Sequence, residues 1–91
     1  MDRLPKTVKK IVSDELVGES LPKMSIIELW SDHRLYVERH LGVYEYSDVE
    51  IHIGVNFGRI IIRGGCLKLA CMSKDSLVVT GQIQNLELLR G

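Results

Sequence analysis

Downstream of Lys23, apolar residues recur at every second position, with polar or small residues beside or between them. This period of two is typical of β-strands that bury one face. Turn-forming residues such as Ser31-Asp32 and Ser47-Asp48 separate the runs. The pattern predicts seven or eight short strands and an all-β domain, with these apolar pairs facing the core: Ile27/Leu29, Leu35/Val37, Tyr44/Tyr46, Ile51/Ile53, Ile60/Ile62, Leu67/Leu69 and Leu77/Val79.

The pairs also repeat, since Leu67/Leu69 follow Ile51/Ile53 by sixteen residues. Two-strand units of that length fit an antiparallel meander that forms a small sandwich or roll. They also fit the coils of a short β-solenoid, although breaks of hairpin length favour the antiparallel arrangement. Gly64-Gly65 is interpreted as a turn between two strands. A change of parity after Ile83 predicts a bulge near Gln84-Asn85.

Residues 1–20 follow a helical period instead and form a candidate short amphipathic helix with a linker. Pro5 suits the first turn of such a helix, and Gly18 suits its C-terminal cap. Its lysines could place it on a membrane surface, but nearby acids dilute their charge, so we favour a helix that covers part of the β domain. Residues 21–91 then form a single β domain, and a chain lacking residues 1–20 should keep a β-type circular dichroism spectrum. The apolar face of the helix comprises Leu4, Val8, Ile11, Val12 and Leu16.

Length and net charge narrow the classes of function. A chain of 91 residues is long enough for one small domain only. Its 12 basic and 12 acidic residues give a formal net charge of zero, which argues against a nonspecific nucleic-acid binder and leaves self-association open. No apolar run approaches the roughly 18 residues of a membrane span, and the start MDRLPKTVKK lacks the apolar stretch of a signal peptide. We therefore expect a cytosolic protein without a transmembrane anchor of its own.

Charge is unevenly distributed along the chain. Residues 21–51 contain three bases and six acids, a net charge of −3, whereas residues 52–91 contain five bases and two acids, a net charge of +3. Complementary acidic and basic regions can favour ordered contacts between proteins. We therefore take the following residues as a candidate interaction surface: Glu45, Asp48, Glu50, Arg59 and Arg63.

Possible catalytic and metal-binding groups gather in the stretch YVERHLGVYEYSDVEIHI. Paired carboxylates can act as general acid and base when burial raises the pKa of one of them. No apolar pocket is evident beside Glu45 and Glu50, so we interpret them as part of a solvated sheet face and expect no catalytic residues. Histidine spacings of seven and twelve residues match no metal-ligand motif. We therefore expect neither a metal nor another cofactor, and interpret all three histidines as surface residues: His33, His40 and His52.

Cys66 and Cys71 are the only cysteines, too few for a disulfide framework. If Leu67 and Leu69 face the core, Cys71 shares their side and Cys66 points the opposite way. The sequence therefore predicts two free thiols, of which Cys71 is buried and Cys66 reacts first with a mild thiol reagent.

Three stretches carry a family resemblance: LPKMSII, RLYVERHLGVYEYSDVEIHI and GRIIIRGGCLKLACMSKDSLVVTGQIQNLEL. The second is the most specific, because it combines Glu38, His40 and Gly42 with a YSD turn. Over residues 21–89 the chain resembles the YabP/YqfC family of sporulation proteins, and its YqfC branch in particular. Trp30-Ser31-Asp32 and the two cysteines depart from the family pattern, without a functional consequence that can be named.

The resemblance implies an all-β, sandwich-like fold and a noncatalytic role in an endospore-forming bacterium. It implies action in the mother cell during spore cortex or coat morphogenesis, in the cytoplasm or peripherally at the outer forespore membrane. The implied partner is a membrane-associated sporulation protein, and a homo-oligomer is compatible with the same role. An assembly or scaffold module is therefore the first hypothesis, and a small ligand- or glycan-binding β module is the alternative.

Overall fold

The computed structural model describes residues 24–91, and the helix expected over residues 1–20 lies outside them. The described chain forms six β-strands that join in one sheet. Four are short: Ile26–Trp30 (β1), Arg34–Glu38 (β2), Gly42–Tyr46 (β3) and Glu50–Val55 (β4). The other two, Gly58–Met72 (β5) and Ser76–Arg90 (β6), contain 15 residues each. Every strand pair is antiparallel, so the predicted all-β antiparallel fold is confirmed and the solenoid alternative is wrong.

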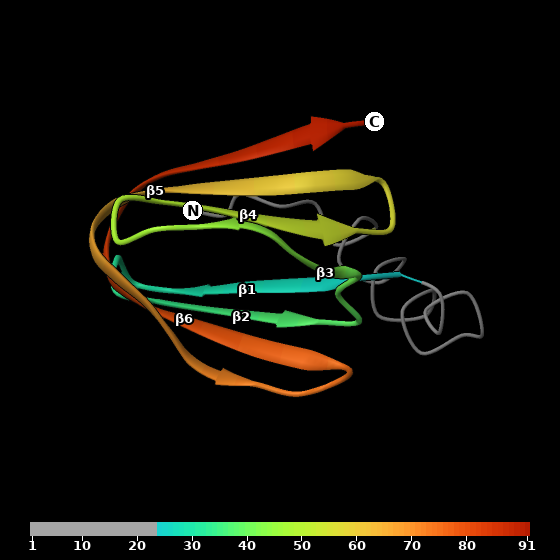
Figure 1. Ribbon diagram of the computed structural model, residues 1–91, viewed down its shortest axis with the longest axis horizontal. Coiled ribbons are helices and arrows are strands. Elements are labelled where there is room, and N and C mark those ends of the chain that lie inside the picture. The colour runs from blue at the N-terminus through green and yellow to red at the C-terminus, as the bar shows by residue number, and fades with distance from the viewer. Residues whose placement is uncertain (1–23) are drawn as a thin grey trace, which may run out of the picture.

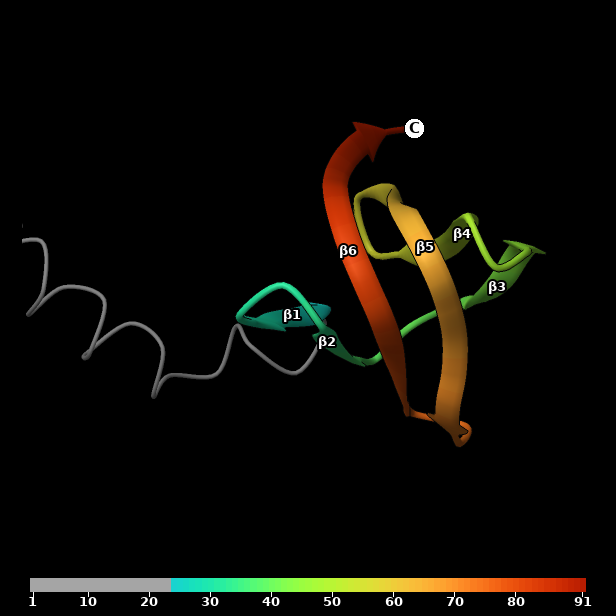
Figure 2. The same cartoon turned by 90° about the vertical axis from the view of Figure 1, so that its left-hand side faces the viewer.

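The strand order β1-β2-β6-β5-β4-β3 places the long β5–β6 hairpin in the middle of the sheet. It departs from a simple meander at one point, because β2 is followed along the chain by β3 at the opposite edge. In Figure 1, β5 and β6 bend together at the left end of the molecule, so the sheet folds over on itself. Figure 2 shows the β1–β2 hairpin on one side of β5 and β6 and the β3–β4 hairpin on the other. Each short hairpin therefore extends one half of the long hairpin, giving a β1–β2 layer and a β3–β4 layer.

Glycines and bulges produce the bend. The register between β5 and β6 shifts between Arg63 and Gly64 and again between Gly65 and Lys68, and such bulges kink and twist a strand. A Cβ atom on Gly64 would collide with the carbonyl oxygen of Gln82, so glycine is required for the two backbones to approach here. Gly64-Gly65 is therefore a bend within one strand. The prediction of a turn at this point, which raised the expected number of strands, is wrong.

The predicted bulge near Gln84-Asn85 is confirmed by the same strand pair. Asn85 pairs with Arg63 and Ile83 pairs with Gly64, which leaves Gln84 without a partner. The extra residue changes the parity of β6, so that Ile83 and Leu86 both contact the core although they are three positions apart.

The two short hairpins are fastened to the bend in the same manner. In the β1–β2 turn, the carbonyl oxygen of Asp32 accepts a hydrogen bond of 2.7 Å from the Ile83 N–H. In the β3–β4 turn, the carbonyl oxygen of Asp48 accepts one of 2.8 Å from the Leu67 N–H. Each turn thus satisfies backbone groups that the bent strands cannot satisfy with each other.

The core lies between the two layers and consists mainly of the residues that the period of two predicts. Tyr44 is an exception, because the register of the edge strand β3 shifts between Val43 and Glu45 and places Tyr44 at the bulge. Tyr46 pairs with the buried Ile51 and Leu29 with the buried Leu35, but both lie on edge strands and are exposed. The buried members are Leu35, Val37, Ile51, Ile53, Val55, Ile60, Ile62, Leu67, Leu77, Val79 and Ile83.

Cys66 and Cys71 are both free and both exposed. The prediction of two unbridged thiols is confirmed, but the prediction of a buried Cys71 is wrong. The register shifts between Leu69 and Cys71, so Cys71 pairs with Val78 rather than continuing the alternation from Leu69. A single bulged residue therefore moves the thiol to the outer side of the sheet.

Candidate interaction face

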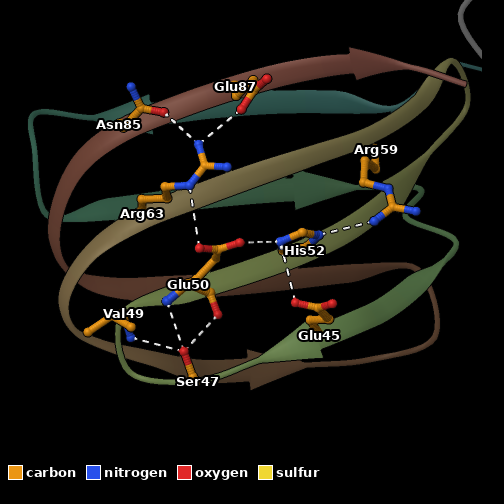
Figure 3. A network of polar contacts seen from close by, with 9 residues as sticks. All are labelled: Glu45, Ser47, Val49, Glu50, His52, Arg59, Arg63, Asn85 and Glu87. Atoms are coloured by element: carbon orange, nitrogen blue, oxygen red, sulfur yellow. Dashed lines mark hydrogen bonds and ion pairs between the residues drawn. The ribbon is translucent and has the colours of Figure 1, made fainter.

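Four of the five residues of the candidate surface lie on the outer face of the β3–β4 layer (Figure 3). Glu45 comes from β3, Glu50 from β4, and Arg59 and Arg63 from β5. Antiparallel pairing brings them together, because Glu50 lies directly opposite Arg63 and opposed residues point to the same side. The fifth residue, Asp48, lies in the exposed β3–β4 turn, and the side-chain contacts that join the cluster do not involve it.

His52 lies at the centre of this face, and its role could not be recognised from the sequence. Its Nε2 atom is 2.6 Å from Glu50 Oε2 and 3.5 Å from Glu45 Oε1, and its Nδ1 atom is 3.1 Å from Arg59 Nη1. These longer side chains cover the imidazole and leave His52 only 8% exposed. The interpretation of His52 as a surface histidine is therefore wrong, although His33 is exposed as predicted.

Arg63 joins the acids of neighbouring strands. Its Nη1 atom donates to Glu87 Oε1 at 2.9 Å and to Asn85 Oδ1 at 3.4 Å, and its Nε atom is 3.4 Å from Glu50 Oε1. The hydrogen bond to Glu87, followed by the nearby charges of Glu50 and Glu87, raises the pKa of Arg63. The hydrogen bond from His52, followed by the charge of Arg63, lowers the pKa of Glu50. The result is a continuous polar network across β3, β4, β5 and β6, which we call the outer ion network.

Tyr44 borders the outer ion network on the side of β3. The guanidinium carbon of Arg59 lies 5.3 Å from the centre of the Tyr44 ring, a cation–π distance. A Cβ atom on Gly54 would collide with the Tyr44 hydroxyl. The absence of a side chain at Gly54 therefore lets the tyrosine ring lie across the sheet and contact Arg59.

Glu45, Glu50 and His52 have the residue types of a metal site, and their ligand atoms lie within 4.8 Å of one another. A histidine that binds a metal normally donates its other ring N–H to an acceptor. Here the other nitrogen, Nδ1, faces the guanidinium of Arg59, which has only donors. Nδ1 must therefore accept, and the ring hydrogen is on Nε2, directed at Glu50. A cation on Nε2 would move that hydrogen to Nδ1 and oppose two donors, so the geometry favours an ion-pair network over a metal site.

The outer ion network also leaves few groups available for reactions. Both carboxylate oxygens of Glu50 have partners, and its lowered pKa makes it a poor general acid at neutral pH. Among residues 24–91, every buried side-chain nitrogen or oxygen has a hydrogen-bond partner. The arrangement is suited to holding four strands rigidly together and presenting a fixed pattern of charge.

The outer face of the β1–β2 layer is aromatic instead. The guanidinium carbon of Arg34 lies 5.9 Å from the centre of the Trp30 ring, and Trp30 Nε1 donates to Glu28 at 3.4 Å. Burial, followed by the nearby Glu38 carboxylate, raises the pKa of Tyr36. Sequence reasoning missed this surface, because Trp30 and Tyr36 come from different strands and only the register brings them together. The shallow groove of about 450 Å³ on this face is lined by Glu28, Trp30, Arg34, Tyr36 and Val78.

A family model described as the YabP family matches residues 22–91, which include all six strands. No curated protein and no solved structure matches the chain. Within residues 24–91, no helix has the length and apolar character needed to cross a membrane. Assignment to the YqfC branch stays a prediction.

Proposed function

We propose a function that follows from the fact that the chain belongs to the YabP family and is a sporulation-associated protein. The protein acts as a noncatalytic assembly module in the mother cell and takes part in spore cortex or coat morphogenesis. Its partner is a membrane-associated sporulation protein, which holds it peripherally at the outer forespore membrane.

The open sheet is the observation that carries the proposal. β1 and β3 end the sheet, so one side of each has no strand partner among the described residues. Addition of an extended segment to such an edge is a common mode of protein recognition, because backbone hydrogen bonds supply affinity and alternate side chains supply specificity. The outer ion network supports the same function, since it stiffens four strands behind the edges without supplying reactive groups.

Chemical cross-linking followed by affinity purification of the tagged chain from sporulating cells tests the proposal. We expect one membrane-associated sporulation protein to be recovered, and deletion of the gene to cause a cortex or coat defect. Recovery of no partner, together with normal cortex and coat in the deletion strain, would contradict the assembly function.

A surface variant sharpens this test. Reversing Arg59 or Arg63 to glutamate would also break their contacts with His52 and Glu50, so a loss of function would not separate folding from binding. Asp48 is exposed and takes no part in the contacts of the outer ion network. Asp48→Lys should therefore lower partner recovery if the candidate surface makes the contact, while the urea midpoint of unfolding stays unchanged.

The groove on the β1–β2 layer favours ligand or glycan binding as a second candidate function, because aromatic rings beside polar groups can stack on sugars and orient them. Trp30 is the only tryptophan in the chain, so its fluorescence reports on this groove alone. A saturable change on titration with soluble peptidoglycan fragments would support this function. An unchanged spectrum up to millimolar fragment would exclude that class of ligand.

A further inference from the structure

The edges of the folded sheet differ in how well they are protected against pairing with another chain. Proteins protect edges with bulges, lysines and charges that point inward. The strand β3 carries a register shift at Tyr44, and the second half of β5 carries two register shifts and Lys68. The second half of β6 places Arg90 on the same side as the core-facing Leu88, two positions earlier. Each of these three edges is therefore interrupted or charged.

The edge strand β1 has none of these protections. It pairs with β2 without a register shift from Ile26 to Trp30, and its sequence IIELW contains no glycine, proline or base. Leu29 points to the same side as its buried partner Leu35 but is 48% exposed, and Trp30 is 57% exposed. A regular backbone edge thus lies beside large apolar side chains that the described chain leaves uncovered.

We propose that β1 pairs with β1 of a second copy of this chain, in an antiparallel two-fold dimer that joins the two β1–β2 layers into one continuous sheet. The dimer deepens the proposed assembly function by naming its contact, and it rests on that function for its biological role.

The charge of Glu28 selects the register of this dimer. Opposed residues in an antiparallel pair point to the same side, so Glu28 faces Ile26, Glu28 or Trp30 of the second copy. A register centred on Glu28 would oppose two carboxylates, which is destabilising. A register centred on Ile27 would set Leu29 against Ser25, whose side chain already donates to the Arg39 carbonyl.

A register centred on Leu29 avoids both problems. It places the two exposed leucines against each other and sets each Glu28 opposite Trp30 of the other copy. Trp30 Nε1 already lies 3.4 Å from its own Glu28, so its N–H can donate to a carboxylate on either side of the contact. The formal net charge of zero leaves no overall repulsion between copies.

The contact involves one strand of five residues on each side. Such a contact falls below the roughly 1,200 Å² of total buried surface that stable complexes reach. We therefore expect a reversible dimer with a dissociation constant in the high micromolar range, which requires a high local concentration to form.

Sedimentation equilibrium and Trp30 fluorescence of the full chain, from low micromolar to millimolar concentration, test the dimer. We expect a monomer–dimer transition accompanied by a blue shift of Trp30 emission as the edge becomes buried. Leu29→Lys should weaken association at least about tenfold, because it places a charge on the contact. Leu88→Lys is the matched control, since Leu88 is also a core-side leucine on an edge and is 60% exposed; it should leave association unchanged.

Glu28→Gln tests the register independently of folding defects in the Leu29 variant. In the register centred on Leu29 it should change the dissociation constant less than about twofold, whereas relief of a carboxylate pair in the register centred on Glu28 would tighten it about two- to fivefold. A chain that stays monomeric at millimolar concentration, or one whose association Leu88→Lys abolishes and Leu29→Lys does not, overturns the proposal. Recovery of a partner from sporulating cells would still support the assembly function in that case, so the two failures are distinguishable.

Discussion

The β1–β2 and β3–β4 hairpins occupy equivalent positions, yet their outer faces have different chemistry. Each flanks one half of the bent β5–β6 hairpin, and each is fastened to the bend through a carbonyl in its turn. The polar groups of the β3–β4 hairpin are bound to one another and to β5 and β6. The β1–β2 hairpin instead presents an aromatic groove and an unprotected edge. The outward side chains of the β3–β4 hairpin therefore stabilise the fold, whereas those of the β1–β2 hairpin remain available for contacts.

The acidic and basic regions of the sequence are not separate surfaces in the folded chain. Glu45 and Glu50 belong to the acidic region, and Arg59 and Arg63 belong to the basic region, but the fold places all four on one face. Most of the expected complementarity is therefore satisfied within the molecule. Among the five candidate residues, Asp48 alone takes no part in the side-chain contacts of that network.

The largest loss in the free energy of unfolding should come from a substitution at the bend of β5 and β6, to which both hairpins are attached. A Cβ atom on Gly64 would meet backbone, the Gln82 carbonyl, whereas one on Gly54 would meet the far end of the Tyr44 side chain. Gly64→Ala should therefore lower the free energy of unfolding by about 2–4 kcal/mol, and Gly54→Ala by less than about 1 kcal/mol, because a side chain can move and a strand pair cannot. Urea unfolding of the two variants measures the difference. Equal losses would show that the bend tolerates separation of β5 from β6.

The polar groups of the two outer faces should also contribute unequally to the free energy of unfolding, by a smaller difference than that between the two glycines. His52→Phe removes the partner of Glu50 and Arg59 at a nearly buried position, and should lower the free energy of unfolding by about 1–3 kcal/mol. Tyr36→Phe removes one hydroxyl that donates to Glu38 at 3.2 Å and should have a smaller effect. Thermal unfolding of both variants provides the comparison. A stability loss for Tyr36→Phe that matches or exceeds the loss for His52→Phe would contradict the assignment of the outer ion network to the fold.

The two hairpins should also make the protein sensitive to opposite ends of the pH range. The fold lowers the pKa of Glu50 from an ordinary value of 4.5, so the stability that Glu50 contributes is complete above pH 4.5 and is lost as the pH falls through the lowered value. The fold raises the pKa of Tyr36 from an ordinary value of 10.0, so its contribution is complete below pH 10.0 and is lost as the pH rises through the raised value.

Midpoints of urea unfolding, measured as a function of pH, check this smallest effect. Glu50→Gln should flatten the acidic limb of the profile only, and Tyr36→Phe should flatten the alkaline limb only. A Glu50→Gln profile parallel to that of the unchanged chain below pH 4.5 would show that Glu50 does not link the outer ion network to stability.

The period of two predicted the fold class and most of the core because burial of one sheet face imposes that period directly. Leu35, Val37 and Ile53, for example, lie where the alternation places them. The path of the strands depends on pairing between distant residues, which a local pattern does not contain. Gly64-Gly65 is compatible with a turn and with a bend, and only the continuous pairing of β5 with β6 decides between them.

The same limit applied to the candidate site. Alternation placed Glu45, Glu50 and His52 correctly on the outer side, because it needs only the parity of each strand. Which residues contact one another depends on the register, so the covering of His52 was not predicted. The error at Cys71 came from the bulge at Ala70, since one inserted residue reverses the parity of everything that follows.

The central position of the β5–β6 hairpin also determines when the chain can fold during its synthesis. Residues 24–57 emerge from the ribosome before either long strand is complete, yet every layer of the sheet is built on β5 and β6. The β1–β2 hairpin pairs only with β6 and consequently has no strand to dock on until β6 has left the exit tunnel, and isolated two-stranded hairpins are marginally stable at best. Folding of the β1–β2 layer is therefore delayed until β6 has been synthesised, and the apolar edge strand β1 stays accessible to chaperones until then.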